Sequence, residues 1–114
     1  MSKVILYGIP NCNSVKKAMD YLNANKIDFV FHNYKKEGID ADKLKSWISK
    51  VGWEIIFNKK GTTWKSIADQ YNKLDEKIAI KIMLEHNSII KRPIIESGKK
   101  LIVGFDETAM AKLK

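Results

Sequence analysis

The first 33 residues constrain the fold more than any other part of the chain, because a strand, a helix and a second strand follow one another there. Residues 4–7 (VILY) form a short apolar run that ends in the turn Gly-Ile-Pro-Asn, which is typical of a buried strand entering a tight turn. From Val15 to Leu22 apolar side chains recur at helical spacing, and Asn13 or Ser14 can cap that helix.

The helix is expected to end within residues 23–26, and residues 27–32 then alternate as a second strand with one face against the core. A connection of this kind nearly always joins parallel neighbouring strands through a right-handed crossover, so the helix begins at the carboxyl edge of the sheet. Cys12, the only cysteine, is placed at that edge.

The middle of the chain, approximately residues 40–88, is predicted to be all-helical, because apolar residues recur there at helical spacing behind polar capping residues. The first helix of this block is expected to begin at Asp40 or Asp42 and to end at Gly52 as its C-cap, and a short helical turn follows over residues 53–57. A further helix is expected to begin at Thr62 or Thr63. The last helix of the block is expected to begin after Asp75 and to end near His86.

The end of the chain changes character. Residues 93–96 and 100–104 read as a β-hairpin, and a last helix is expected to start at Asp106 or Glu107. The prediction is therefore an α/β fold with a mixed four-stranded sheet, ordered β-α-β and then β-β-α. Residues 1–114 form one domain in this interpretation, and the helical block is an insertion within it.

Charge and cysteine content restrict the partners and the compartment. The net charge of +8 comes from lysines scattered along the chain, which favours a solvated surface over a nucleic-acid face. A single cysteine forms no internal disulfide, and no apolar run is long enough for a signal peptide or a membrane span. We therefore expect a cytoplasmic monomer without a membrane or nucleic-acid partner.

Cys12 is the candidate for chemistry. A cysteine just before a helix places its sulfur near backbone N–H groups and the positive end of the helix dipole, and both favour the nucleophilic thiolate. Lys16, one turn further on, is expected to add to this effect. The alternative is that a lone cysteine serves only as a small buried apolar side chain.

Arg92 and Pro93 form the second feature. Arg92 is the only arginine, and Pro93 opens a β-like run where its missing N–H does no harm. A planar, permanently charged guanidinium is suited to binding an oxyanion or a thiolate. The alternative is a surface arginine in a salt bridge.

Taken together, several segments resemble the arsenate-reductase-related family that contains ArsC, Spx and YffB, and the YffB-like branch most of all. The segments, in order, are residues 8–18 (GIPNCNSVKKA), 52–54 (GWE), 61–64 (GTTW), 90–94 (IKRPI) and 103–107 (VGFDE).

The resemblance implies a thioredoxin-like fold in which a cis-Pro93 faces Cys12. It also implies that Cys12 attacks the substrate while Arg92 binds it, and that glutathione, or a glutaredoxin-like thiol donor, supplies electrons. A basic residue of the helical block, Lys59 or Lys60, is expected to take part. Of these two lysines, Lys60 is the one that we predict to bind substrate. The other expected binding residues are Asn11, in the turn before the cysteine, and Lys16.

Three departures argue against arsenate as substrate. Gly8 stands where the family's reductases carry histidine, Ser14-Val15-Lys16 replaces Thr-Ser-Arg, and residues 103–105 lack the C-terminal arginine. A lost bidentate arginine contact is worth roughly 1.5–3 kcal/mol per bond to a charged group. The expected function is therefore a glutathione-dependent monothiol reductase that uses glutathione as co-substrate.

The alternative is a regulator or binding module similar to Spx, acting through the alpha subunit of RNA polymerase. Spx proteins usually carry a second cysteine at the position of Val15, and they share Gly52 with the other branches, so Gly52 does not discriminate between them.

No resident cofactor or metal is implied by the sequence. His32 and His86 have no third ligand at metal spacing, and no Gly-rich phosphate loop or carboxylate pair occurs.

Overall fold

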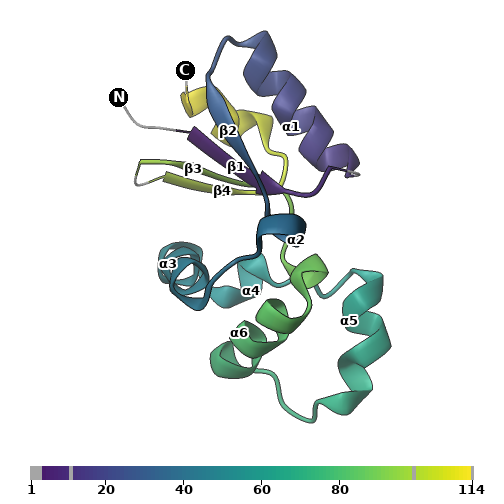
Figure 1. The fold of residues 1–114 in the computed structure, drawn as a ribbon. Coiled ribbons are helices and arrows are strands. Elements are labelled where there is room, and N and C mark those ends of the chain that lie inside the picture. The colour runs from purple at the N-terminus through teal and green to yellow at the C-terminus, as the bar shows by residue number, and fades with distance from the viewer. Residues whose placement is uncertain (1–3, 11, 99, 114) are drawn as a thin grey trace. The chain divides into compact units, whose positions relative to one another are not determined.

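The computed structural model describes residues 4–10, 12–98 and 100–113, which form two compact units. The sheet unit comprises residues 1–37 and 92–114, and the helical unit comprises residues 38–91 (Figure 1). In the described parts of the chain, no helix has the length and apolar character needed to cross a membrane.

The sheet unit has the predicted thioredoxin-like α/β fold, with four strands in the order β2-β1-β3-β4. β1 pairs with β2 in parallel and with β3 antiparallel, and β3 pairs antiparallel with β4, so the mixed sheet is confirmed. Its elements are β1 (Val4–Gly8), α1 (Asn13–Ala24), β2 (Phe29–Asn33), α2 (Tyr34–Glu37), β3 (Ile94–Ser97), β4 (Lys100–Val103), α7 (Glu107–Met110) and the 3-10 turn Ala111–Leu113.

One face of the sheet is covered by α1 and α7. Alternate residues of β1 point toward these helices, as the period of two in a strand requires. Together with the apolar stripe of α1 they make a single buried cluster, which fixes α1, and therefore the residue before it, against the end of β1. The members of this cluster are Val4, Leu6, Val15, Ala18, Leu22, Ile95, Ile102 and Met110.

The second strand begins two residues later than the predicted Ile27, because Ile27 belongs to the end of α1. Its N–H donates to the Leu22 carbonyl at 2.9 Å, and the Lys26 N–H donates to Asn23 at 3.1 Å. With Lys26 at φ 58°, this is a Schellman-type C-cap, which agrees with the predicted helix end.

The helical unit contains the predicted helices. α3 has Asp40 as N-cap, with Oδ1 accepting the Lys43 N–H at 2.7 Å, and α6 has Asp75, which accepts the Ile78 N–H at 2.9 Å. Both capping predictions are confirmed. The elements are α3 (Ala41–Val51), α4 (Trp53–Ile56), α5 (Thr62–Ile67) and α6 (Glu76–Glu85), with 3-10 turns at Ala68–Gln70 and Asn87–Ile89.

One capping prediction in this unit is wrong. Gly61, not Thr62 or Thr63, is the N-cap of α5, and Thr62 is its first residue. The Thr63 hydroxyl instead lies 2.8 Å from that of Ser88 and so links α5 to the segment after α6. Within the unit, Phe57, which follows α4, forms an isolated antiparallel bridge with Ile90, near the end of the unit.

Candidate functional site

Two segments reach the same edge of the sheet through the parallel pairing of β1 and β2. β1 ends at Gly8 and β2 ends at Asn33, and these two residues are register partners. Cys12 follows the end of β1, and Tyr34 follows the end of β2 directly. Both residues therefore lie at the carboxyl edge of the parallel pair, where ligands bind in sheets of this kind.

A third segment reaches this edge from the opposite direction. β3 runs antiparallel to β1, and its first residue, Ile94, pairs with Tyr7 near the end of β1. Arg92 and Pro93 precede β3 and so come to the edge at which β1 ends. The bond between them is cis, and the Pro93 carbonyl accepts the Gly104 N–H at 2.7 Å.

Cys12 is itself the N-cap of α1, so the prediction that Asn13 or Ser14 caps this helix is wrong. Its backbone is extended, at φ −122° and ψ 124°, and its carbonyl accepts the Lys16 N–H at 3.0 Å, the first bond of the helix. The sulfur thereby lies near the N–H groups of the first turn, at the end of α1 that favours negative charge.

This position lowers the pKa of the Cys12 thiol below its ordinary value. Partial burial raises the pKa, but hydrogen bonding from the backbone N–H of Val15, the Arg92 side chain and the Ser14 N–H outweighs it, with the charge of Arg92 adding to the effect. The thiolate is thus stabilised by the helix end and by one cation together. That cation is Arg92, which arrives from another strand.

The half-buried Arg92 guanidinium lies beside the Cys12 sulfur and the phenol oxygen of Tyr34, close enough for each to act on its pKa. Burial alone lowers the pKa of an arginine, yet these two partners raise the pKa of Arg92 above its usual value, so it stays charged. A sulfur nucleophile, a fixed cation and a buried phenol therefore meet at one edge of the sheet unit.

Tyr34 was not anticipated from the sequence. Its side chain is 1% exposed, and burial raises its pKa to about 12 despite the nearby Arg92 charge. The helix that begins with it, α2, was also missed. Asn33 Oδ1 accepts the N–H groups of Lys35 and Lys36 at 3.2 and 3.3 Å, and Glu37 accepts the Asn33 N–H at 3.0 Å, so a reciprocal cap sustains this single turn.

Comparison with known proteins agrees with this architecture. The sequence profile of the ArsC family matches residues 7–113. This chain belongs to the ArsC family. The solved structure of a YffB protein is 40% identical to it, covers 97% of this chain and 98% of its own, and superposes with a TM-score of 0.93. The predicted resemblance to the family, with its YffB-like branch, is confirmed.

Two curated ArsC-family relatives are also similar along most of their length. An uncharacterized protein of Haemophilus influenzae is 37% identical over 105 residues, which cover 91% of this chain and 92% of the relative. The global transcriptional regulator Spx of Lactiplantibacillus plantarum is 30% identical over 106 residues, which cover 91% of this chain and 80% of the relative. One of these two relatives is thus a transcriptional regulator.

The position of Gly8 explains one departure from the family's arsenate reductases. A Cβ atom built on Gly8 meets Val15 Cγ2 at 2.6 Å and Cγ1 at 3.1 Å, closer than real carbon contacts allow. Val15 is fully buried in the first turn of α1. A histidine at residue 8 is therefore incompatible with this packing, and the two departures at Gly8 and Val15 are one structural feature.

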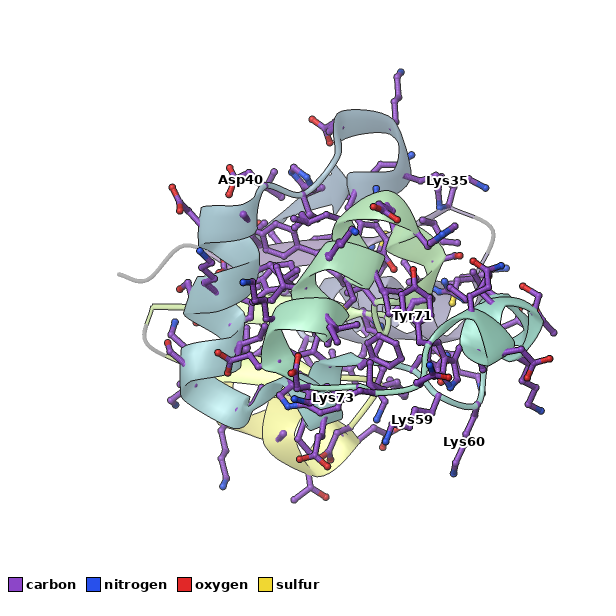
Figure 2. All side chains as sticks on the ribbon, turned by 90° about the horizontal axis from the view of Figure 1, so that it is seen from below. Lys35, Asp40, Lys59, Lys60, Tyr71 and Lys73 are labelled. Carbon is purple, nitrogen blue, oxygen red and sulfur yellow. The ribbon has the colours of Figure 1, made fainter. Side chains whose placement is uncertain are left out.

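The other predicted binding residues belong to both units, and each is described within its own unit. Lys16 is exposed on α1, and Pro93 is buried beside Arg92. Lys60 belongs to the helical unit, where its side chain extends away from the ribbon (Figure 2). Lys59, its alternative, lies with Nζ 5.6 Å from the ring centroid of Trp53. Asn11 lies outside the described residues.

A second polar cluster in the sheet unit surrounds Tyr7 of β1 and His32 of β2. The Tyr7 hydroxyl donates to Glu96 Oε1 at 2.7 Å, and the rings of Tyr7 and His32 have centroids 4.9 Å apart. His32 Nδ1 lies 3.8 Å from Glu37 Oε2. Over residues 4–10, 12–98 and 100–113, no three His, Cys, Asp or Glu side chains gather as a metal site would require.

Proposed function

We propose that this ArsC-family chain is a glutathione-dependent monothiol reductase related to arsenate reductase, with Cys12 as its nucleophile. The observation that supports this most is the Cys12 sulfur at the N-cap of α1, with a lowered pKa and Arg92 beside it. A thiolate available near neutral pH is the requirement for attack on a disulfide.

The reaction uses one protein sulfur and two glutathione equivalents. The Cys12 thiolate attacks the glutathione sulfur of a mixed disulfide RS–SG, so a bond forms between Cys12 and glutathione and RS⁻ leaves to take a proton from water. A glutathione thiolate then attacks the glutathione sulfur on Cys12. This step releases glutathione disulfide and restores the Cys12 thiolate. The net reaction is RS–SG + GSH → RSH + GSSG, so the RS sulfur gains the one electron equivalent that the free glutathione sulfur loses, and the thiol proton of glutathione is balanced by the proton on RSH.

The neighbouring residues have separate roles in this proposal. Arg92 stabilises the thiolate before attack and the leaving thiolate afterwards, because both carry negative charge near its guanidinium. Pro93 presents its segment at the same sheet edge, where backbone groups can bind the peptide part of glutathione. Lys16, Lys60 and Asn11 are proposed to contribute to binding the two glutathione carboxylates or the substrate. Such a cycle suits the reducing cytoplasm.

Arsenate fits this site less well than a disulfide does. Arg92 is the single arginine of the chain, so the family's other oxyanion-binding arginines have no arginine counterpart. The packing of Val15 against Gly8 leaves no room for a histidine side chain at residue 8. A disulfide needs one nucleophile and one stabilising cation, and both are present.

The test is turnover of a glutathione mixed disulfide with purified protein, with glutathione disulfide production followed by a coupled NADPH assay. Wild-type protein is expected to accelerate the reaction, and Cys12→Ser to return it to the uncatalysed rate. Arsenate replaces the mixed disulfide in a parallel assay and is expected to be reduced far more slowly. Full turnover by Cys12→Ser overturns the proposal.

The 30% identity with the regulator Spx supports a second candidate, a binding module that contacts the RNA polymerase alpha subunit. Gly52→Ala tests it, because a Cβ at Gly52 meets nothing within 4 Å while its φ of 89° disfavours alanine. Gly38→Ala is the matched control, with φ 78° and equally open space. This candidate is favoured if purified alpha subunit binds the wild-type protein, if Gly52→Ala weakens that binding while Gly38→Ala does not, and if the protein shows no reductase turnover.

A further inference from the structure

The Tyr34 hydroxyl has no evident role in packing the core. Its ring is buried at the first position of α2, where a phenylalanine ring of the same shape would fill the space. A buried hydroxyl costs stability unless it is hydrogen-bonded, so a tyrosine here requires a partner for its oxygen. The Arg92 guanidinium, which precedes β3 at the same sheet edge, lies beside this oxygen and is suited to donate to it.

The same guanidinium also lies beside Cys12, so two groups that follow neighbouring strands act on Arg92. An arginine side chain has many rotamers, and a contact at a single atom leaves most of them accessible. A second contact from the planar fork restricts its orientation. Tyr34 follows β2 and Cys12 follows the end of β1, so the parallel pairing of these strands brings both to the edge of the sheet at which Arg92 precedes β3.

We propose that Tyr34 is a positioning residue, whose phenol oxygen holds the Arg92 guanidinium in the orientation that faces the Cys12 sulfur. This inference rests on the proposed role of Cys12 as nucleophile. Tyr34 acts through Arg92 and is not itself a catalytic residue.

The chemistry of the phenol explains why a tyrosine serves here. A carboxylate in the same place would also hold the guanidinium, but its charge would cancel the stabilisation that Arg92 gives the thiolate. Because the pKa of Tyr34 is raised to about 12, its hydroxyl stays neutral throughout the pH range in which the thiol titrates. Arg92 is thereby positioned without loss of its electrostatic effect on Cys12.

The experiment measures the pH midpoint of Cys12 alkylation by the neutral reagent iodoacetamide in four proteins: wild type, Tyr34→Phe, Arg92→Ala and the double variant. Tyr34→Phe is expected to raise the midpoint by about half a pH unit, which is about a threefold loss of rate below the midpoint. In the Arg92→Ala background the same change is expected to have no effect.

Tyr7→Phe is the matched control. It also removes one phenol oxygen from the sheet unit, but that oxygen donates to Glu96 Oε1 at 2.7 Å. A merely structural hydroxyl would alter the unfolding temperature and leave the midpoint unchanged, as is expected for Tyr7→Phe. A wild-type midpoint in Tyr34→Phe overturns the proposal, and so does an equal rise with and without Arg92.

A second measurement tests the inference if Tyr34→Phe fails to fold. The chain has one arginine, so the guanidinium N–H signals in a nitrogen-15 NMR spectrum belong to Arg92 alone. In Cys12→Ser protein, where the thiolate is gone, Tyr34 is expected to keep these hydrogens slow to exchange with water. Exchange at the rate of free arginine overturns the proposal. Neither measurement depends on turnover, so loss of the proposed reductase activity is distinguishable from failure of this inference.

Discussion

The contact between Gly8 and Val15 gives a quantitative prediction for the Gly8→Ala variant. The added Cβ would lie 2.6 Å from Val15 Cγ2, about 1 Å inside the usual carbon contact distance. Val15 is fully buried and β-branched, so it cannot rotate away without a poor rotamer. Overpacking of this size costs about 1–3 kcal/mol of the free energy of unfolding.

Whether Gly8→Ala raises or lowers the free energy of unfolding distinguishes the clash with Val15 from the usual effect of replacing a glycine. Gly8 does not have a positive φ, so alanine fits its backbone and, without the clash, would stabilise by about 0.4–1 kcal/mol through the unfolded state. Urea denaturation of wild type, Gly8→Ala, Val15→Ala and the double variant forms a thermodynamic cycle. Gly8→Ala is expected to be destabilising in wild type and neutral or stabilising in Val15→Ala. Equal effects of Gly8→Ala in both backgrounds would refute the reasoning.

Three further predictions follow from the same structure. Arg92→Ala is expected to raise the pKa of Cys12, because it removes the positive charge that stabilises the thiolate; alkylation against pH measures the change. Asp40→Ala is expected to cost about 1 kcal/mol by removing the cap that accepts the Lys43 N–H, with Asp40→Asn as the control that keeps an acceptor; urea denaturation measures both. Because the pKa of Cys12 is lower in the folded state, wild type should gain stability relative to Cys12→Ser as pH rises through the folded-state pKa toward about 8.5. Thermal unfolding of both proteins measures this, and a difference in unfolding temperature that does not change with pH would contradict it.

The helices were predictable where their signals are local. Asp40, Asp75 and Asp106 each accept an N–H three residues further along, and this contact depends on a few neighbouring residues. The single turn α2 was not predictable from periodicity, because four residues are too few to show a helical face. Its start depends on two side-chain caps, Asn33 and Glu37, within a polar segment.

The candidate site was predictable in part. Cys12 is marked by a strand, a turn and a helix that are contiguous in the sequence, so its position at the sheet edge followed from local pattern. The cation beside it did not follow in the same way. Lys16 is near in sequence, but Arg92 reaches the sulfur from a distant strand, and Tyr34 reaches Arg92 through strand register. Contacts of this kind depend on the assembled sheet.

The central claim is a nucleophilic thiolate at Cys12, and the most direct test is the pH dependence of its alkylation, followed by mass spectrometry with and without glutathione disulfide. The account predicts a midpoint below the reference value of about 8.5 for an ordinary cysteine, together with a single glutathione adduct on Cys12 that free glutathione removes. A midpoint at the ordinary value with no adduct would contradict it.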